Sequence, residues 1–164
     1  MKRLDMNINC FLILIFALLA PLLSYGASSA QEIVFSCRDN SVKFHQILEL
    51  IKNGEEAALI QSFGCITSLD GGTLGDLYES YGKFFDKKPA FFLMHGKQHL
   101  TKKDFIFVLL KTPIENIDNI EQQQKLLSSR HKLLLNNSHL LNKNLYEYIS
   151  SEISNRIKNL ESIK

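Results

Sequence analysis

The chain has 164 residues, of which 45% are hydrophobic, and its 19 Lys and Arg against 17 Asp and Glu give a formal net charge of +2. This composition is that of a globular protein with a single core, and its near-neutral balance argues against nucleic acid or an anionic membrane surface as a partner.

The first thirty residues are predicted to be a secretory signal peptide. Lys2 and Arg3 form its charged start, residues 10–23 its apolar run, and residues 28–30 a small-residue cleavage site. The apolar run is shorter than the roughly twenty residues that span a bilayer, so we expect no stable membrane insertion after cleavage. The expected mature protein is one domain, residues 31–164, in the periplasm or secreted from the cell.

The mature chain would keep two cysteines, Cys37 and Cys65, because Cys10 leaves with the signal peptide. In an oxidising compartment a disulfide between them is the expected state. It would close a loop of 28 residues, which corresponds to about 3 to 4 kcal/mol of stabilisation. The alternative is a reactive thiol with His45 as its base, which no motif around either cysteine supports.

Helices are predicted along the whole mature chain after a short extended arm at residues 32–37. The first begins at Asn40 or Ser41 and ends at Gly54, with apolar residues at helical spacing. The second runs over residues 55–63 and closes at Gly64, so that the two helices form a hairpin.

Residues 69–113 hold the strongest start and stop signals. Thr73 and Asp76 have capping-box spacing and predict a helix that follows the glycine turn at residues 70–72. Pro89 predicts the start of a shorter helix that ends at Gly96. Thr101 and Asp104 repeat the capping-box spacing, with Leu100 and Phe105 placed as a hydrophobic staple, and Pro113 is expected to end this buried helix.

Two longer helices are predicted after this stretch. One begins at Asp118 and stops at Asn136 and Asn137, and the last runs over residues 143–162. We therefore expect an all-α protein with six or seven helices in antiparallel hairpins, arranged as a HEAT-like stack or an irregular bundle.

The run of residues 69–92, LDGGTLGDLYESYGKFFDKKPAFF, resembles the helix pairs of poorly characterised secreted bacterial proteins with HEAT-like folds. The exported cysteine pair and the segment at residues 73–77 are also similar to secreted, disulfide-containing immunity proteins of bacterial toxin systems. These resemblances imply helical architecture and a protein partner, and neither implies catalytic residues.

Candidate sites for chemistry are few. His95 and His99 have the spacing of two metal ligands on one helix face, but no third ligand accompanies them. Asp70 and Asp76 lack the ligand pattern of a calcium loop. We therefore predict no catalytic, cofactor-binding or metal-binding residues and no cofactor.

Aromatic side chains at helical spacing have two interpretations. Core packing is the favoured one, because aromatic rings dominate burial energetics. If one helix face is exposed, the same residues form an interaction surface; its members would be Tyr78, Tyr81, Phe85, Phe91 and Phe92.

The function that these patterns favour is a non-enzymatic, exported protein-interaction module with an unidentified protein partner. One alternative is an immunity or inhibitor protein against a periplasmic toxin. A second is a small exported hydrolase or metal-dependent enzyme that uses some of His45, His95, His99 and the acids nearby, and a third is a purely structural or stress-related helical protein.

Overall fold

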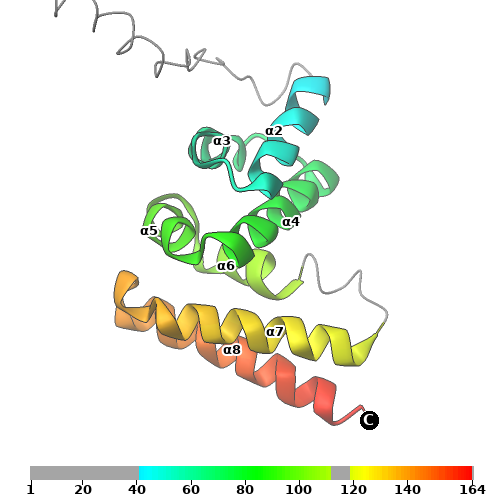
Figure 1. Ribbon diagram of the computed structural model, residues 1–164, viewed down its shortest axis with the longest axis vertical. Helices are drawn as coiled ribbons and strands as arrows, with labels where there is room; N and C mark the ends of the chain where they lie inside the picture. Colours follow the sequence, from blue (N-terminus) through cyan, green and yellow to red (C-terminus); the bar gives the residue numbers. More distant parts are fainter. Residues whose placement is uncertain (1–40, 112–118, 164) are drawn as a thin grey trace, which may run out of the picture. The chain divides into compact units, whose positions relative to one another are not determined.

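The computed structural model describes residues 41–111 and 119–163, and this part of the chain contains α-helices and shorter helical turns but no β-strand. Seven α-helices are present in these residues, which confirms the predicted all-α class (Figure 1). They are α2 (Ser41–Asn53), α3 (Glu56–Ser62), α4 (Gly71–Lys87), α5 (Pro89–His99), α6 (Lys102–Ile106), α7 (Ile120–Asn136) and α8 (Lys143–Glu161). The same residues include two 3₁₀ turns, η2 (Phe63–Cys65) and η4 (Ser138–Leu140), and a π-helical turn, η3 (Phe107–Lys111). The predicted signal peptide, extended arm, Cys37, Pro113 and Asp118 lie outside the described residues.

Several helices begin or end at capping residues that the sequence predicts. Thr101 and Asp104 form the predicted capping box, in which each side chain accepts a hydrogen bond from the other's backbone N–H. Gly54 ends α2 with a φ of 91°, a left-handed conformation that glycine adopts without a Cβ clash.

The start of α4 differs from the prediction. Asp70, not Thr73, is the N-cap residue, and its carboxylate accepts a hydrogen bond from the Thr73 backbone N–H. Asp is the better cap of the two because its charge also complements the positive helix N-terminus. The two glycines of the predicted turn therefore lie in the first turn of the helix.

The predicted end of α5 at Gly96 is wrong. The helix continues to His99, and Gly96 is buried inside it. A Cβ at Gly96 would lie 3.3 Å from a Leu100 methyl carbon and 3.4 Å from the Phe105 ring. The glycine therefore serves close packing against the next helix.

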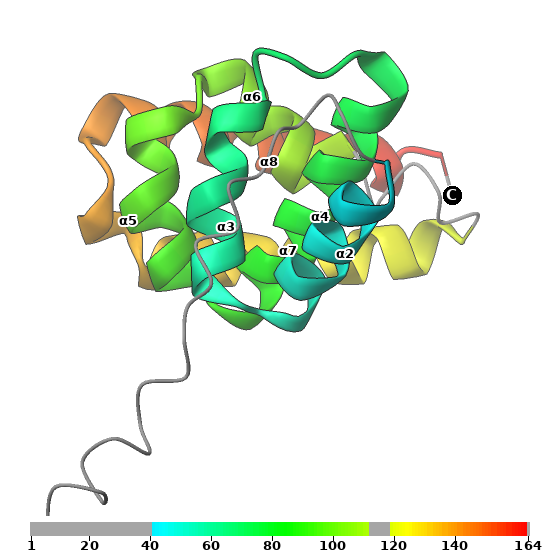
Figure 2. The same ribbon diagram turned by 90° about the horizontal axis from the view of Figure 1, so that it is seen from above.

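The helices pack around one continuous hydrophobic core. Along the chain, α2 packs most extensively on α4 rather than on its neighbour α3 (Figures 1 and 2), and α7 packs on α8. The turn η3 contacts α4, α7 and α8. The predicted arrangement as stacked antiparallel hairpins stays a prediction.

Candidate functional site

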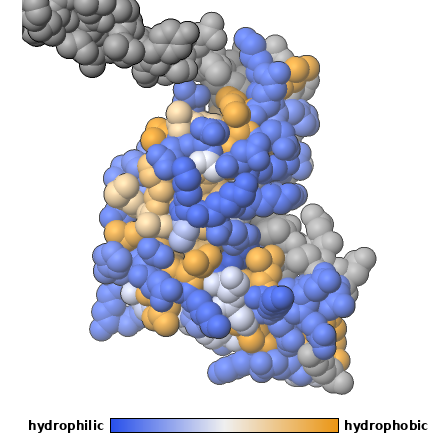
Figure 3. Space-filling model, in the orientation of Figure 1, coloured by the Kyte–Doolittle hydropathy of each residue, from blue (hydrophilic) through white to orange (hydrophobic). Residues whose placement is uncertain are grey.

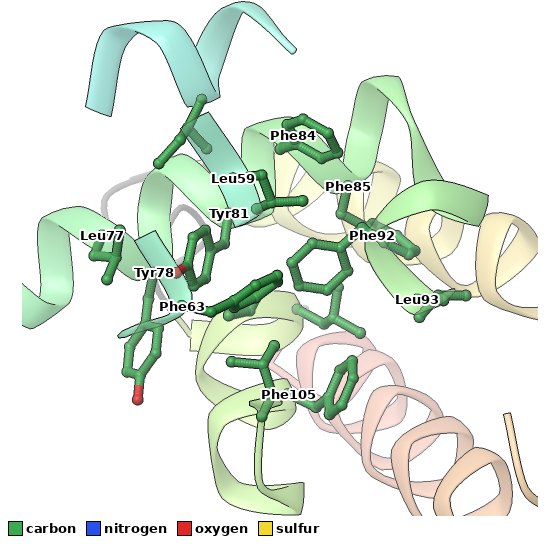
Figure 4. Packing of buried hydrophobic residues seen from close by; sticks show 14 of the residues in the cluster. Leu59, Phe63, Leu77, Tyr78, Tyr81, Phe84, Phe85, Phe92, Leu93 and Phe105 are labelled. Carbon is green, nitrogen blue, oxygen red and sulfur yellow. The ribbon is translucent and has the colours of Figure 1, made fainter. Parts of the chain in front are cut away.

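The aromatic residues predicted as a possible interaction surface lie almost entirely in the core. Tyr78, Tyr81, Phe85 and Phe92 are at most 5% exposed, and Phe91 is half-buried. Figure 4 shows the rings of Phe92, Tyr81 and their neighbours gathered between helices. Tyr78, Tyr81 and Phe85 recur at spacings of three and four on the inward face of α4, and Phe92 is buried from α5. These four residues therefore pack in the core, as the favoured interpretation expects, and do not form an exposed surface.

Both tyrosines of this set, Tyr78 and Tyr81, form side-chain hydrogen bonds through their hydroxyl groups. The Tyr81 hydroxyl is 2.9 Å from the hydroxyl of buried Ser62. The Tyr78 hydroxyl points out of the ring cluster in Figure 4 and donates to the Asp104 carboxylate, the same group that caps α6. Burial raises the pKa of both tyrosines above the ordinary value, and the hydrogen bond to Asp104 raises that of Tyr78 further.

The histidines that were candidate metal ligands or bases do not converge. His95 stacks on Phe91, with ring centroids 4.4 Å apart, and His99 stacks on Phe63 at 4.8 Å. His131 forms a hydrogen bond with Ser150, and His45 is exposed on α2. Within residues 41–111 and 119–163, no three His, Cys, Asp or Glu side chains are placed to hold a metal ion.

A buried arginine, which sequence reasoning missed, forms the main polar cluster of the described core. Arg130 of α7 is 0% exposed. Its Nε and Nη2 each donate to one carboxylate oxygen of Asp86 at 2.8 Å, a bidentate pair with the end of α4. Its Nη1 donates to the carbonyl oxygens of Val108 and Leu109 at 3.0 and 3.1 Å.

These carbonyls belong to the last turn of the helix formed by α6 and η3, where backbone acceptors have no partner within the helix. Arg130 satisfies two of them and so joins α4, η3 and α7 at one point. A guanidinium has five N–H donors, and within the described residues it makes four hydrogen bonds. The cluster therefore holds the fold together rather than presenting a charge to a ligand.

Gly82 makes room for this cluster. A Cβ at Gly82 would lie 2.8 Å from Arg130 Nη2 and 3.0 Å from the Val108 carbonyl oxygen, closer than side chains tolerate. A sequence signal for the cluster does exist: Arg130 lies three residues after buried Leu127 and four before buried Leu134, on the apolar stripe of its helix.

A different surface is left exposed on α2. Phe44, Ile47, Leu48 and Ile51 face the core, and the opposite side lines an open cavity of about 690 Å³. We call this side the α2 outer surface; it consists of Val42, His45, Gln46, Glu49, Leu50 and Asn53. Val42 is 65% exposed and Leu50 is 40% exposed. Elsewhere, on the face shown in Figure 3, hydrophobic residues form small areas separated by hydrophilic ones.

Cys65, one half of the expected disulfide, is fully buried in the turn η2. Because Cys37 lies outside the described residues, the disulfide stays a prediction.

The chain matches no known family model, and no curated protein or solved structure is significantly similar to it. None of the helices in the described ranges combines the length and apolar character needed to cross a membrane.

Proposed function

We propose that this protein is a non-enzymatic, exported helical module that binds another protein through the α2 outer surface. The observation that carries the proposal is the two-sided character of α2. One side is buried in the core, and the other exposes Val42 and Leu50, which line an open cavity.

Exposed aliphatic residues on a helix face give a partner apolar area to bury, at roughly 25 cal/mol per Å². His45, Gln46, Glu49 and Asn53 surround them with hydrogen-bonding groups. An apolar centre with a polar rim is the usual composition of a protein interface. On the same helix, Lys52 pairs with Glu49 at 2.8 Å, and this pair lowers the pKa of Glu49, so the rim keeps a carboxylate.

The test is affinity capture of the mature chain, residues 31–164, from a periplasmic extract of its host, followed by mass spectrometry. We expect one stoichiometric partner for the wild type and its loss with Val42→Asp combined with Leu50→Asp. The matched control is Leu135→Asp on α7, because Leu135 is 57% exposed and lies outside the α2 outer surface. It should retain the partner, and all three proteins should melt at the same temperature. A partner that the double variant retains, or no partner for the wild type, would count against the proposal.

Export and the disulfide belong to the same proposal, and the two cysteines provide a separate test. In the purified exported protein, we expect Cys37 and Cys65 to resist alkylation until a reductant is added. Replacing Cys65 with Ser should lower the free energy of unfolding by about 3 to 4 kcal/mol if the bond acts by restricting the unfolded chain. Reductant should then destabilise the wild type and leave the variant unchanged. Free thiols in the exported wild type would overturn this part of the proposal.

A further inference from the structure

A second, smaller cavity lies between η3 and α8, away from the α2 outer surface. It has a volume of about 200 Å³, below the range of about 300 to 1,000 Å³ that is typical for drug-sized ligands. Ile106 and Leu110 supply aliphatic lining, and Lys111 lies at the end of η3 beside them. A cavity of this size suits a ligand no larger than a single amino-acid residue.

The α8 side of the cavity is polar. Glu152, Asn155, Arg156 and Asn159 follow one another at spacings of three, one and three residues and line the cavity from one helix face. None of these four side chains takes part in a hydrogen bond or ion pair with another side chain or backbone group in the described ranges. Their donors and acceptors are therefore available to a ligand.

The charged side chains of this cavity favour a ligand that carries a carboxylate. The guanidinium of Arg156 offers a planar pair of N–H donors that matches a carboxylate. The Lys111 ammonium lies 4.7 Å from the centre of the Phe107 ring, so it adds positive charge near the cavity rather than a donor inside it. Glu152 supplies an acceptor for a ligand N–H group. Aliphatic lining beside these groups favours a carboxylate that carries an apolar side chain.

The segment that carries Leu110 and Lys111 is held by contacts outside the cavity. It is the π-helical turn η3, whose Val108 and Leu109 carbonyls are held by buried Arg130. Single π-helical turns inside α-helices occur frequently at functional sites. Here the turn sets the position of two cavity residues, and the Arg130 cluster limits its movement, so the η3 side of the cavity is organised before a ligand enters.

We propose that the cavity between η3 and α8 binds the α-carboxylate of an aliphatic amino-acid residue, with Arg156 on the carboxylate and Glu152 on the neighbouring N–H group. The same chemistry is offered by a free amino acid and by the C-terminal residue of a peptide. In the first case Glu152 accepts from an ammonium group, and in the second from a peptide N–H.

Isothermal titration calorimetry of the mature chain with leucine, N-acetyl-leucine and leucinamide measures the binding affinities that test this proposal. We expect saturable binding of leucine or N-acetyl-leucine and none of leucinamide, which lacks the carboxylate. Binding of leucine alone assigns a free amino acid, and binding of N-acetyl-leucine alone assigns a peptide chain end. Binding of neither, or equal binding of leucinamide or of inorganic sulfate, would overturn the proposal.

The matched variants are Arg156→Gln and Lys158→Gln, both on exposed positions of α8. Loss of a charge-assisted hydrogen bond at Arg156 should weaken binding by about tenfold or more. Lys158 does not line the cavity, so its replacement should leave the affinity unchanged. Equal affinity for the wild type and Arg156→Gln would also contradict the assignment.

Discussion

Arg130 shows how much of this fold depends on single side chains. A fully buried guanidinium is costly to desolvate, and Asp86 with two backbone carbonyls compensates that cost. We expect Arg130→Met to lower the free energy of unfolding by about 2 to 4 kcal/mol, because it leaves the carbonyls of buried Val108 and Leu109 without their donor. The Asp86 carboxylate adds less to this loss, since its side chain is 32% exposed to water. Urea denaturation followed by circular dichroism measures this change.

The control for this variant is Lys132→Met, an exposed position on the same helix, which should change stability by no more than about 0.5 kcal/mol. Combining Arg130→Met with Asp86→Leu should cost less than the sum of the two single variants, since the pair acts as a unit. Simple additivity would show that the two residues do not stabilise each other.

Two glycines of α4 form a matched pair for a second prediction. Gly82→Ala places a methyl group against Arg130 and the Val108 carbonyl, so it should destabilise the protein by about 1 to 3 kcal/mol. A methyl group at Gly75 would meet no atom within 4 Å beyond its chain neighbours and the backbone of its own helix, so Gly75→Ala should stabilise α4 by about 0.5 to 1 kcal/mol. Thermal melts that shift both variants in the same direction would contradict this interpretation.

At the scale of elements, the start of α6 depends on one carboxylate with two roles. Asp104 caps the helix through Thr101 and also accepts from the Tyr78 hydroxyl. Thr101→Ala should cost about 1 kcal/mol, the usual value for a lost N-cap. Asp104→Ala should cost more, because it also leaves the Tyr78 hydroxyl without its acceptor. If urea denaturation shows equal losses in the free energy of unfolding for the two variants, the contact with Tyr78 does not contribute to stability.

Helix starts and stops are largely predictable because they depend on nearest neighbours in the sequence. The capping box at Thr101 and the stop at Gly54 are local, and the structure has both. The π-helical turn is not predictable, because its carbonyls are held by Arg130, 21 and 22 residues further along the chain. The prediction at Gly96 is wrong for the same reason: its role is set by contact with Phe105 and Leu100, and a glycine near a predicted helix end is ordinarily a C-cap.

For the whole molecule, the all-α class follows from the spacing of apolar residues, whereas the choice of packing partners does not. Apolar stripes show that α2 and α4 each need a partner, but they do not say that α2 prefers α4 over α3. Helical spacing also could not tell which candidate residues are exposed. The predicted aromatic surface and the core share one helical spacing, and burial alone separated them.

Stability should depend on pH in the alkaline range. The pKa values of Tyr78 and Tyr81 are raised in the folded state, so the unfolded chain releases these protons from about pH 10 while the folded chain keeps them. Folding stability is therefore present below about pH 10 and falls as the pH rises above it. Urea denaturation from about pH 8 upward should show this loss.

The tyrosine variants isolate the origin of that pH dependence. Tyr81→Phe loses the hydrogen bond to Ser62 and should start less stable, but its stability should fall less steeply above about pH 10. Tyr78→Phe should behave in the same way. An unchanged slope in both variants would assign the alkaline loss to other groups.

The groups that meet at Arg130 are far apart along the chain. Asp86 lies 44 residues before it, and the η3 carbonyls about half that distance. Closing such long loops lowers the conformational entropy of the chain before the contacts form that offset this loss. We therefore expect this cluster to assemble late in folding, after α4 and η3 have formed. Interactions made after the folding transition state govern how fast a protein unfolds rather than how fast it folds. The contacts of buried Arg130 with Asp86 and the η3 carbonyls would then slow unfolding and so determine the lifetime of the folded state.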